Sequence, residues 1–88
     1  MVTRRYQVII TPAAQKTLAR IEKKMRLRIQ GVIELLSQNP TPPAARKLSV
    51  RPEYRVRVGD YRILYEIFED QLIIDVIQVG HRRDVYGQ

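Results

Sequence analysis

The sequence contains no cysteine and only one histidine. Without cysteine, neither a disulfide framework nor a thiolate metal site can form. One histidine among singly scattered acidic residues offers no set of metal ligands. A Ser–His–Asp spacing, a P-loop and a GxGxxG motif are also absent. We therefore expect neither a metal nor an organic cofactor.

Long apolar runs are missing as well. No stretch approaches the ~20 apolar residues of a membrane span, and the first six residues lack the apolar core of a signal peptide. The 88 residues, 44% of them hydrophobic, suffice for one modest core, and no repeat or long linker divides them. We expect one domain over residues 1–88, in the cytoplasm and without a membrane partner.

Positive charge is the most prominent feature that is present. Sixteen Lys and Arg against nine Asp and Glu give a net charge of +7, and twelve of the sixteen are Arg. Such a field attracts polyanions: nucleic acid, an anionic membrane or an acidic protein. The planar guanidinium fork matches phosphate, so the excess of Arg favours nucleic acid. The alternative is a basic coat that only keeps the protein soluble.

A long segment with helical spacing follows the N-terminal residues. Thr11 can cap a helix whose first residue is Pro12. One helix from there to Ser37 would span roughly 39 Å, whereas a domain of this size has a radius of gyration of about 12 Å. We therefore predict a break around Lys23–Lys24, which gives a helical hairpin. The proline-rich run Asn39–Pro43 ends this part of the chain.

The remaining segments have the composition and alternation of strands. The order predicts an α+β fold, with the helical hairpin packed on one face of a small, mostly antiparallel sheet (β-α-α-β-β-β, with one further strand possible). Leu72–Val79 is apolar on both faces apart from Asp75 and Gln78, which predicts a central position. The predicted strands are Tyr6–Ile10, Tyr54–Val58, Tyr61–Phe68 and Leu72–Val79, with Leu48–Val50 as a candidate for the further one.

A two-residue turn at Gly59-Asp60 sets the register of the central hairpin. Val58 then lies opposite Tyr61, and Arg57 opposite Arg62. Directly opposed residues share a face of the sheet. The face expected to pack on the helices comprises Tyr54, Val56, Val58, Tyr61, Ile63 and Tyr65.

Three arginines converge on the other face: Arg55, Arg57 and Arg62. Like charges directly opposite each other destabilise a sheet, and such a conflict is expected mainly at functional sites. We therefore interpret them as a phosphate-binding site that points away from the core. The alternative is that nearby carboxylates neutralise the three guanidiniums; the candidates are Glu53, Asp60 and Glu66.

A second cluster, the run Gly80–Tyr86, follows the last predicted strand. His81 is the only side chain with an unperturbed pKa near neutrality, which makes it a candidate proton donor or acceptor. A surface residue or a structural donor is the simpler interpretation of a lone histidine.

The two segments that contain these clusters, Tyr54–Tyr65 and Val79–Tyr86, resemble the corresponding segments of the RelE/ParE superfamily of toxins. The Asn39-Pro40 turn and Lys47-Leu48 also fit the pattern of that superfamily. The resemblance covers essentially the whole chain and implies a small sheet carrying a helical hairpin. RelE-type members cleave mRNA in the ribosomal A site without a metal. An antitoxin encoded beside each toxin wraps it, and the complex helps to repress their operon. The implied partners are therefore an acidic, RelB-like antitoxin, mRNA on the ribosome and, through the complex alone, operator DNA.

The resemblance also assigns roles to individual residues. Arg55 and Arg57 match the paired basic residues of the family's catalytic strand, and Arg62 matches its phosphate-binding arginine. Arg82 matches a basic residue after the last strand, and Tyr86 a tyrosine that stacks on the substrate base. This chain departs from the family where active RelE proteins often carry lysines, with arginines at 55 and 57. At position 81 it has histidine where some members have lysine.

These residues suit the stabilisation of a phosphorane better than proton transfer. Arginine stays protonated above pH 12, so we predict that His81 supplies the acid or base, with Tyr86 second. Two alternatives stay open. ParE-type relatives inhibit DNA gyrase by binding it, without nuclease activity, and a degenerate member would bind only antitoxin and operator DNA.

Overall fold

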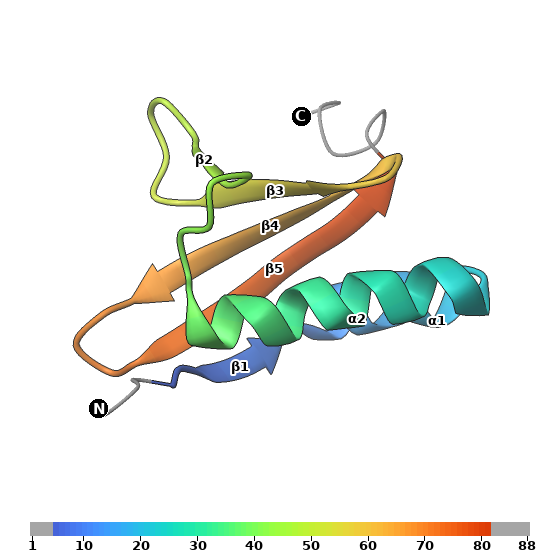
Figure 1. Cartoon of the computed structure of the whole chain (residues 1–88), viewed down its shortest axis with the longest axis horizontal. Helices are drawn as coiled ribbons and strands as arrows, with labels where there is room; N and C mark the ends of the chain where they lie inside the picture. The colour runs from blue at the N-terminus through green and yellow to red at the C-terminus, as the bar shows by residue number, and fades with distance from the viewer. Residues whose placement is uncertain (1–4, 82–88) are drawn as a thin grey trace.

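The computed structural model describes residues 5–81 as two helices and five strands. Both helices lie on one side of the sheet (Figure 1), which confirms the predicted α+β class. The radius of gyration is 12.5 Å. In chain order the elements are β1 (Gln7–Ile10), α1 (Pro12–Arg20), α2 (Lys23–Gln38), β2 (Arg46–Lys47), β3 (Tyr54–Val58), β4 (Tyr61–Phe68) and β5 (Ile73–His81).

The helical hairpin begins and breaks for local reasons. The side chain of Thr11 accepts a hydrogen bond from the amide of Ala14 at 3.2 Å, and proline follows the cap. The break comes slightly before the predicted Lys23–Lys24, because Ile21 is extended (φ −79°, ψ 141°). Its side chain is buried, so the chain reverses while keeping that side chain in the core.

The strand order is β1-β5-β4-β3-β2, with β1 parallel to β5 and the other neighbours antiparallel. The central position predicted for the last strand is confirmed, since β5 lies between β1 and β4. The further strand is Arg46–Lys47, so the candidate Leu48–Val50 was wrong. Lys47 pairs with Tyr54, and the chain must turn between them, which places Val50 in an exposed loop.

The turn between β3 and β4 has the predicted geometry. Val58 pairs with Tyr61, so the loop is Gly59-Asp60. Gly59 has φ +60°, and Asp60 does not share the positive φ. A positive φ at the first central residue alone defines a type II′ turn, which suits the twist of a hairpin and requires glycine there.

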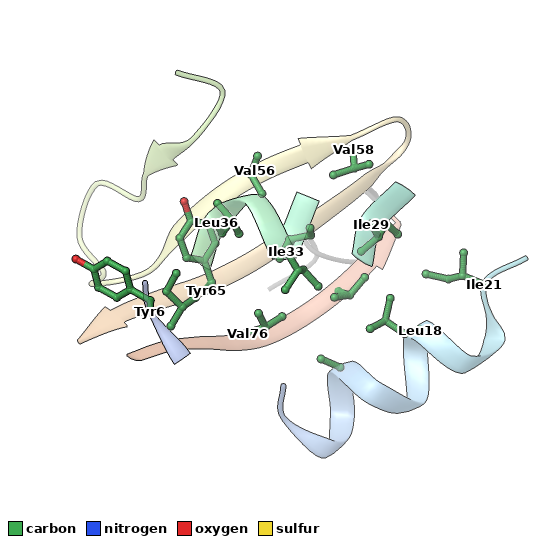
Figure 2. Close-up of a cluster of buried hydrophobic side chains, with 14 residues drawn as sticks. Tyr6, Leu18, Ile21, Ile29, Ile33, Leu36, Val56, Val58, Tyr65 and Val76 are labelled. Atoms are coloured by element: carbon green, nitrogen blue, oxygen red, sulfur yellow. The ribbon is translucent and has the colours of Figure 1, made fainter. Parts of the chain in front are cut away.

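The core lies between the helices and the predicted apolar face of the sheet. Side chains from both layers point into one cluster (Figure 2). Tyr65, Ile63, Ile29 and Leu36 have no exposed surface. The face assignment derived from the turn is therefore confirmed.

A β-bulge interrupts the pairing of β4 with β5. Leu64 pairs with Gln78 and Tyr65 with Val76, which leaves Ile77 as the extra residue. The hydroxyl of Thr11 donates a hydrogen bond of 2.8 Å to the carbonyl of Ile77, so the helix cap also satisfies the carbonyl of the bulge. The bulge allows Asp75 and Gln78, three residues apart, to point to the same face.

Tyr65 connects the sheet to the proline-rich loop. Its hydroxyl donates a hydrogen bond of 2.6 Å to the carbonyl of Pro40, and its ring stacks on Tyr54 at 5.8 Å. Burial, with a smaller contribution from Tyr54, raises the pKa of Tyr65 to about 12.

This shift predicts a loss of stability at high pH. Above pH 10 the unfolded chain releases the phenolic proton, whereas the folded chain keeps it until about pH 12. The associated stability is complete below pH 10 and disappears as pH rises to 12, by an amount on the order of 2–3 kcal/mol. We expect Tyr65→Phe to lack this loss when urea unfolding is compared with wild type at pH 9 and pH 11.5. Parallel pH profiles for the two proteins would contradict the assignment.

Candidate nucleic-acid interface

The side of the sheet opposite the helices carries a cluster of arginines from three strands. Strand pairing places Arg46 opposite Arg55 and Arg57 opposite Arg62. Arg57 and Arg62 alternate with the buried Val56, Val58 and Ile63, so they point away from the core. We call this side the open face, and its four residues Arg46, Arg55, Arg57 and Arg62 the arginine face.

The arginine face contains two directly opposed pairs of like charge. Opposed side chains on neighbouring antiparallel strands have Cβ atoms about 4.5–5.5 Å apart, and like charges at that spacing destabilise the sheet. Several fixed guanidiniums on adjacent strands, however, match the oxygens of a phosphodiester. The arrangement is unfavourable for folding and favourable for binding a polyanion.

The carboxylates proposed as neutralising partners do not form ion pairs with this cluster. Glu53 lies 3.1 Å from Arg51, and another ion pair joins Arg5 to Glu34 on the helix side. Within residues 5–81, Asp60 and Glu66 form no ion pair. Arg57 is exposed and forms none with any residue that the structure describes. The interpretation that Glu53, Asp60 and Glu66 neutralise the three guanidiniums is therefore not supported.

The arginines differ in how far they are covered. Arg57 is exposed and Arg55 is half-buried, whereas Arg62 is only 9% exposed. Leu64, two residues along β4 on the same face, is also buried. Arg62 therefore points away from the core, as predicted, but its stem is packed, and an alanine there removes packing as well as charge. A substitution at Arg57 therefore tests the contribution of the positive charge with less disturbance of packing than one at Arg62.

Arg46 is a member of the site that the sequence did not reveal. It lies on β2, two residues before the segment proposed as a strand. Its Nη1 donates hydrogen bonds to the carbonyls of Pro43 at 2.7 Å and Ala45 at 3.1 Å, which hold the side chain against its own loop. The two-residue strand is too short to show an alternation, so only its pairing with β3 identifies this arginine.

The structure does not bring His81 together with the arginine face. His81 pairs with Tyr61, which points toward the helices, and their rings meet edge to face at 5.6 Å. It lines a groove of about 290 Å³ beside α1, with Thr17 and Arg20. The other two predicted site residues, Arg82 and Tyr86, lie outside the described residues.

The described part of the chain contains neither a cluster of metal-ligating side chains nor a membrane-spanning helix. Within residues 5–81, no three His, Asp or Glu side chains gather closely enough to hold a metal ion. Neither described helix is long and apolar enough to cross a membrane.

Comparison with known proteins gives consistent matches along nearly the whole chain. Residues 8–86 match the model of the family described as the ParE toxin of type II toxin–antitoxin systems, parDE. A putative RelE-like toxin protein of Escherichia coli is 30% identical over 87 residues, which cover 94% of this chain and 92% of the relative.

Solved structures of similar fold include toxin–antitoxin complexes and isolated toxins. The archaeal RelE–RelB complex from Pyrococcus horikoshii matches with a TM-score of 0.80 and 26% identity, over 89% of this chain and 96% of that one. The complex RelBE2 from Mycobacterium tuberculosis matches in fold with a TM-score of 0.79 at 23% identity, over 89% and 92% of the two chains. The chain therefore belongs to the RelE/ParE superfamily and is a toxin of a type II toxin–antitoxin system.

Proposed function

We propose that this toxin is a metal-independent endoribonuclease of the RelE type, which cleaves mRNA in the ribosomal A site. The observation that carries the proposal is the arginine face, where two like-charged pairs stand directly opposed on β2, β3 and β4. Guanidiniums fixed in this arrangement match the charged non-bridging oxygens of the pentavalent phosphorane that forms during RNA cleavage.

The reaction follows from the chemistry of RNA itself. The 2′-hydroxyl attacks the adjacent phosphorus and loses its proton, and the 5′-oxygen leaves and gains one. The first product carries a 2′,3′-cyclic phosphate. Negative charge accumulates on the non-bridging oxygens in the transition state, so positioned cations accelerate the step. In the proposal, Arg57 and Arg62 hold those oxygens and Arg55 holds a neighbouring phosphate. By resemblance, Arg82 adds a further cation and Tyr86 stacks on a base.

His81 is the candidate that the sequence offers for proton transfer, but its side chain lies on the opposite face of the sheet from the arginine face. We expect His81→Gln to change the cleavage rate by less than tenfold, because the side chain lies on the helix side of the sheet with Tyr61. Loss of a general acid or base typically lowers the rate by about 10²-fold or more. A fall of that size, with unchanged RNA affinity and melting temperature, would show that His81 does take part in proton transfer.

The arginine face is also suited to bind the antitoxin, the protein that inhibits the toxin. The structural relatives from Pyrococcus horikoshii and Mycobacterium tuberculosis are complexes of toxin and antitoxin. We propose that the cognate antitoxin covers the arginine face with an acidic segment that folds on contact. Operator DNA would then be bound by the complex and not by the toxin alone.

Gyrase inhibition is a second candidate, because the matching family model is that of the ParE toxin. Two assays with the purified chain separate the candidates. Cell-free translation, with the message analysed by primer extension, reveals ribosome-dependent cuts if the toxin acts as RelE does. A supercoiling assay with DNA gyrase loses activity if it acts as ParE does. We expect cuts in the message and unimpaired supercoiling; the reverse pair of results would select the gyrase inhibitor.

A further inference from the structure

The open face changes sign along the strands. The residues of β4 that point to this face are Arg62, Leu64, Glu66 and Phe68. They are every second residue of the strand, and the bulge adds no residue to β4 itself. The end near the Gly59-Asp60 turn is therefore basic, and the other end is acidic and apolar. Leu64 separates the two charged parts. The sign change is built into one strand and does not depend on the position of a loop.

Two carboxylates face each other at the acidic end. Glu66 pairs directly with Asp75 across β4 and β5, so their Cβ atoms are about 4.5–5.5 Å apart, a like-charged pair that destabilises the sheet. One carboxylate oxygen of Asp75 is buried and accepts no hydrogen bond from any residue that the structure describes. Neither side chain forms an ion pair with any residue between 5 and 81. Buried polar atoms are normally satisfied, so this carboxylate pair is unfavourable for the fold alone.

The distances are short enough for the carboxylates to act on a bound polyanion. Four residues along a strand separate Arg62 from Glu66, about 13 Å between Cα atoms. The long side chain of an arginine can hold a phosphate closer to Glu66 than these 13 Å. At physiological salt, dissolved ions screen most of the interaction between two exposed charges only when the charges are more than roughly 8 Å apart. A phosphate displaced from the arginine face toward Glu66 therefore meets two negative charges.

The arrangement leaves one favourable path for a nucleic acid. The arginines extend across β2, β3 and β4, perpendicular to the strands, whereas a path along β4 leads to the carboxylates. A single strand that crosses the sheet can keep its phosphates on the arginine face. A double helix presents two phosphate backbones, and one of them would lie over Glu66 and Asp75.

We propose that Glu66 and Asp75 form a negative boundary of the RNA site, which restricts binding to a short single-stranded segment and excludes duplex RNA. This inference rests on the proposed function, since it assumes that the arginine face binds phosphate. The boundary selects the form of the substrate and takes no part in proton transfer.

The test compares single-stranded with duplex RNA on the full-length chain. The probes are a 2′-O-methyl RNA strand, which the proposed chemistry cannot cut, and the same strand annealed to its complement. We expect Glu66→Gln combined with Asp75→Asn to raise the affinity for the duplex about fivefold or more, as two removed charges at this spacing imply. Affinity for the single strand should change less. The salt slope for the duplex should steepen, because more phosphates are neutralised.

A matched control removes two negative charges elsewhere. Glu22 caps α2 without a side-chain hydrogen bond, and the side chain of Glu34 forms an exposed ion pair with Arg5. The variant with Gln at both positions should leave the preference for single-stranded RNA unchanged. An equal gain in duplex binding for both double variants would show a general charge effect and overturn the boundary. Slower cleavage of unmodified RNA at constant affinity in Glu66→Gln would overturn it too, in favour of a role in proton transfer.

One further variant separates the two proposals. If Arg57→Ala does not weaken binding of the single strand, the proposed function itself fails. If Arg57→Ala weakens it while the Glu66 and Asp75 double variant behaves as wild type, only the boundary fails. Thermal melting confirms that each variant is folded, and the double variant should melt no lower than wild type because a like-charged pair is removed.

Discussion

Arg57→Ala is expected to lower the rate of RNA cleavage by about 10²–10³-fold, the usual effect of removing one fixed donor from a developing oxyanion. The melting temperature should stay the same or rise slightly. Arg57 is exposed, stands directly opposite Arg62 and forms no ion pair with a described residue, so its removal relieves repulsion without opening the core.

Single-turnover cleavage of mRNA on the ribosome measures the effect on the rate, and binding of free RNA at several salt concentrations measures the loss of phosphate contacts. The salt slope for single-stranded RNA should decrease by about 0.7 log units for each phosphate contact that is lost. Arg28→Ala is the matched control, because Arg28 is an exposed arginine of α2 on the helix side. Equal cleavage rates for Arg57→Ala and Arg28→Ala would show that only the total charge matters.

Ile63→Ala is expected to lower the stability of the fold and to leave cleavage by the folded molecules unchanged, the opposite of Arg57→Ala. Ile63 has no exposed surface and belongs to the core cluster. Its truncation should lower the free energy of unfolding by about 2–5 kcal/mol, through lost burial and the cavity left behind. The folded fraction should cleave RNA at the wild-type rate, because this side chain lies on the helix side of the sheet.

Urea unfolding and cleavage per folded molecule test this separation. Ile63→Val should lower the unfolding free energy by only about 0.5–1.5 kcal/mol, which provides a graded control. If Ile63→Ala lost activity without losing stability while Arg57→Ala unfolded, the two faces of the hairpin would be exchanged. A one-residue slip of register would produce that result.

The features that sequence predicted are those set by local chemistry. The alternation of Val56, Arg57 and Val58 and the Gly59-Asp60 turn define both the hairpin and its two faces without reference to the rest of the chain. Thr11 and Pro12 mark the start of α1 in the same way. These elements agree with the structure because their determinants lie within a few residues of one another.

The features that sequence did not predict depend on distant partners. The two-residue strand that contains Arg46 exists only through its pairing with β3. The bulge at Ile77 depends on a hydrogen bond from Thr11, 66 residues earlier. Strict alternation along β5 would place His81 on the face of Asp75; the bulge shifts the alternation by one residue and moves His81 to the helix side.

The 2′-hydroxyl dependence of cleavage tests the central claim most directly. The cut site is first mapped by primer extension in cell-free translation, and a message with one 2′-deoxynucleotide on the 5′ side of that cut is then offered to the wild-type toxin. If the arginine face stabilises attack by the 2′-hydroxyl, the substituted message stays intact at that position, while the unmodified message is cut there and yields a 2′,3′-cyclic phosphate or its hydrolysis product. Cutting of the substituted message at the same position and rate would show that another nucleophile attacks the phosphorus, and would contradict the proposed mechanism.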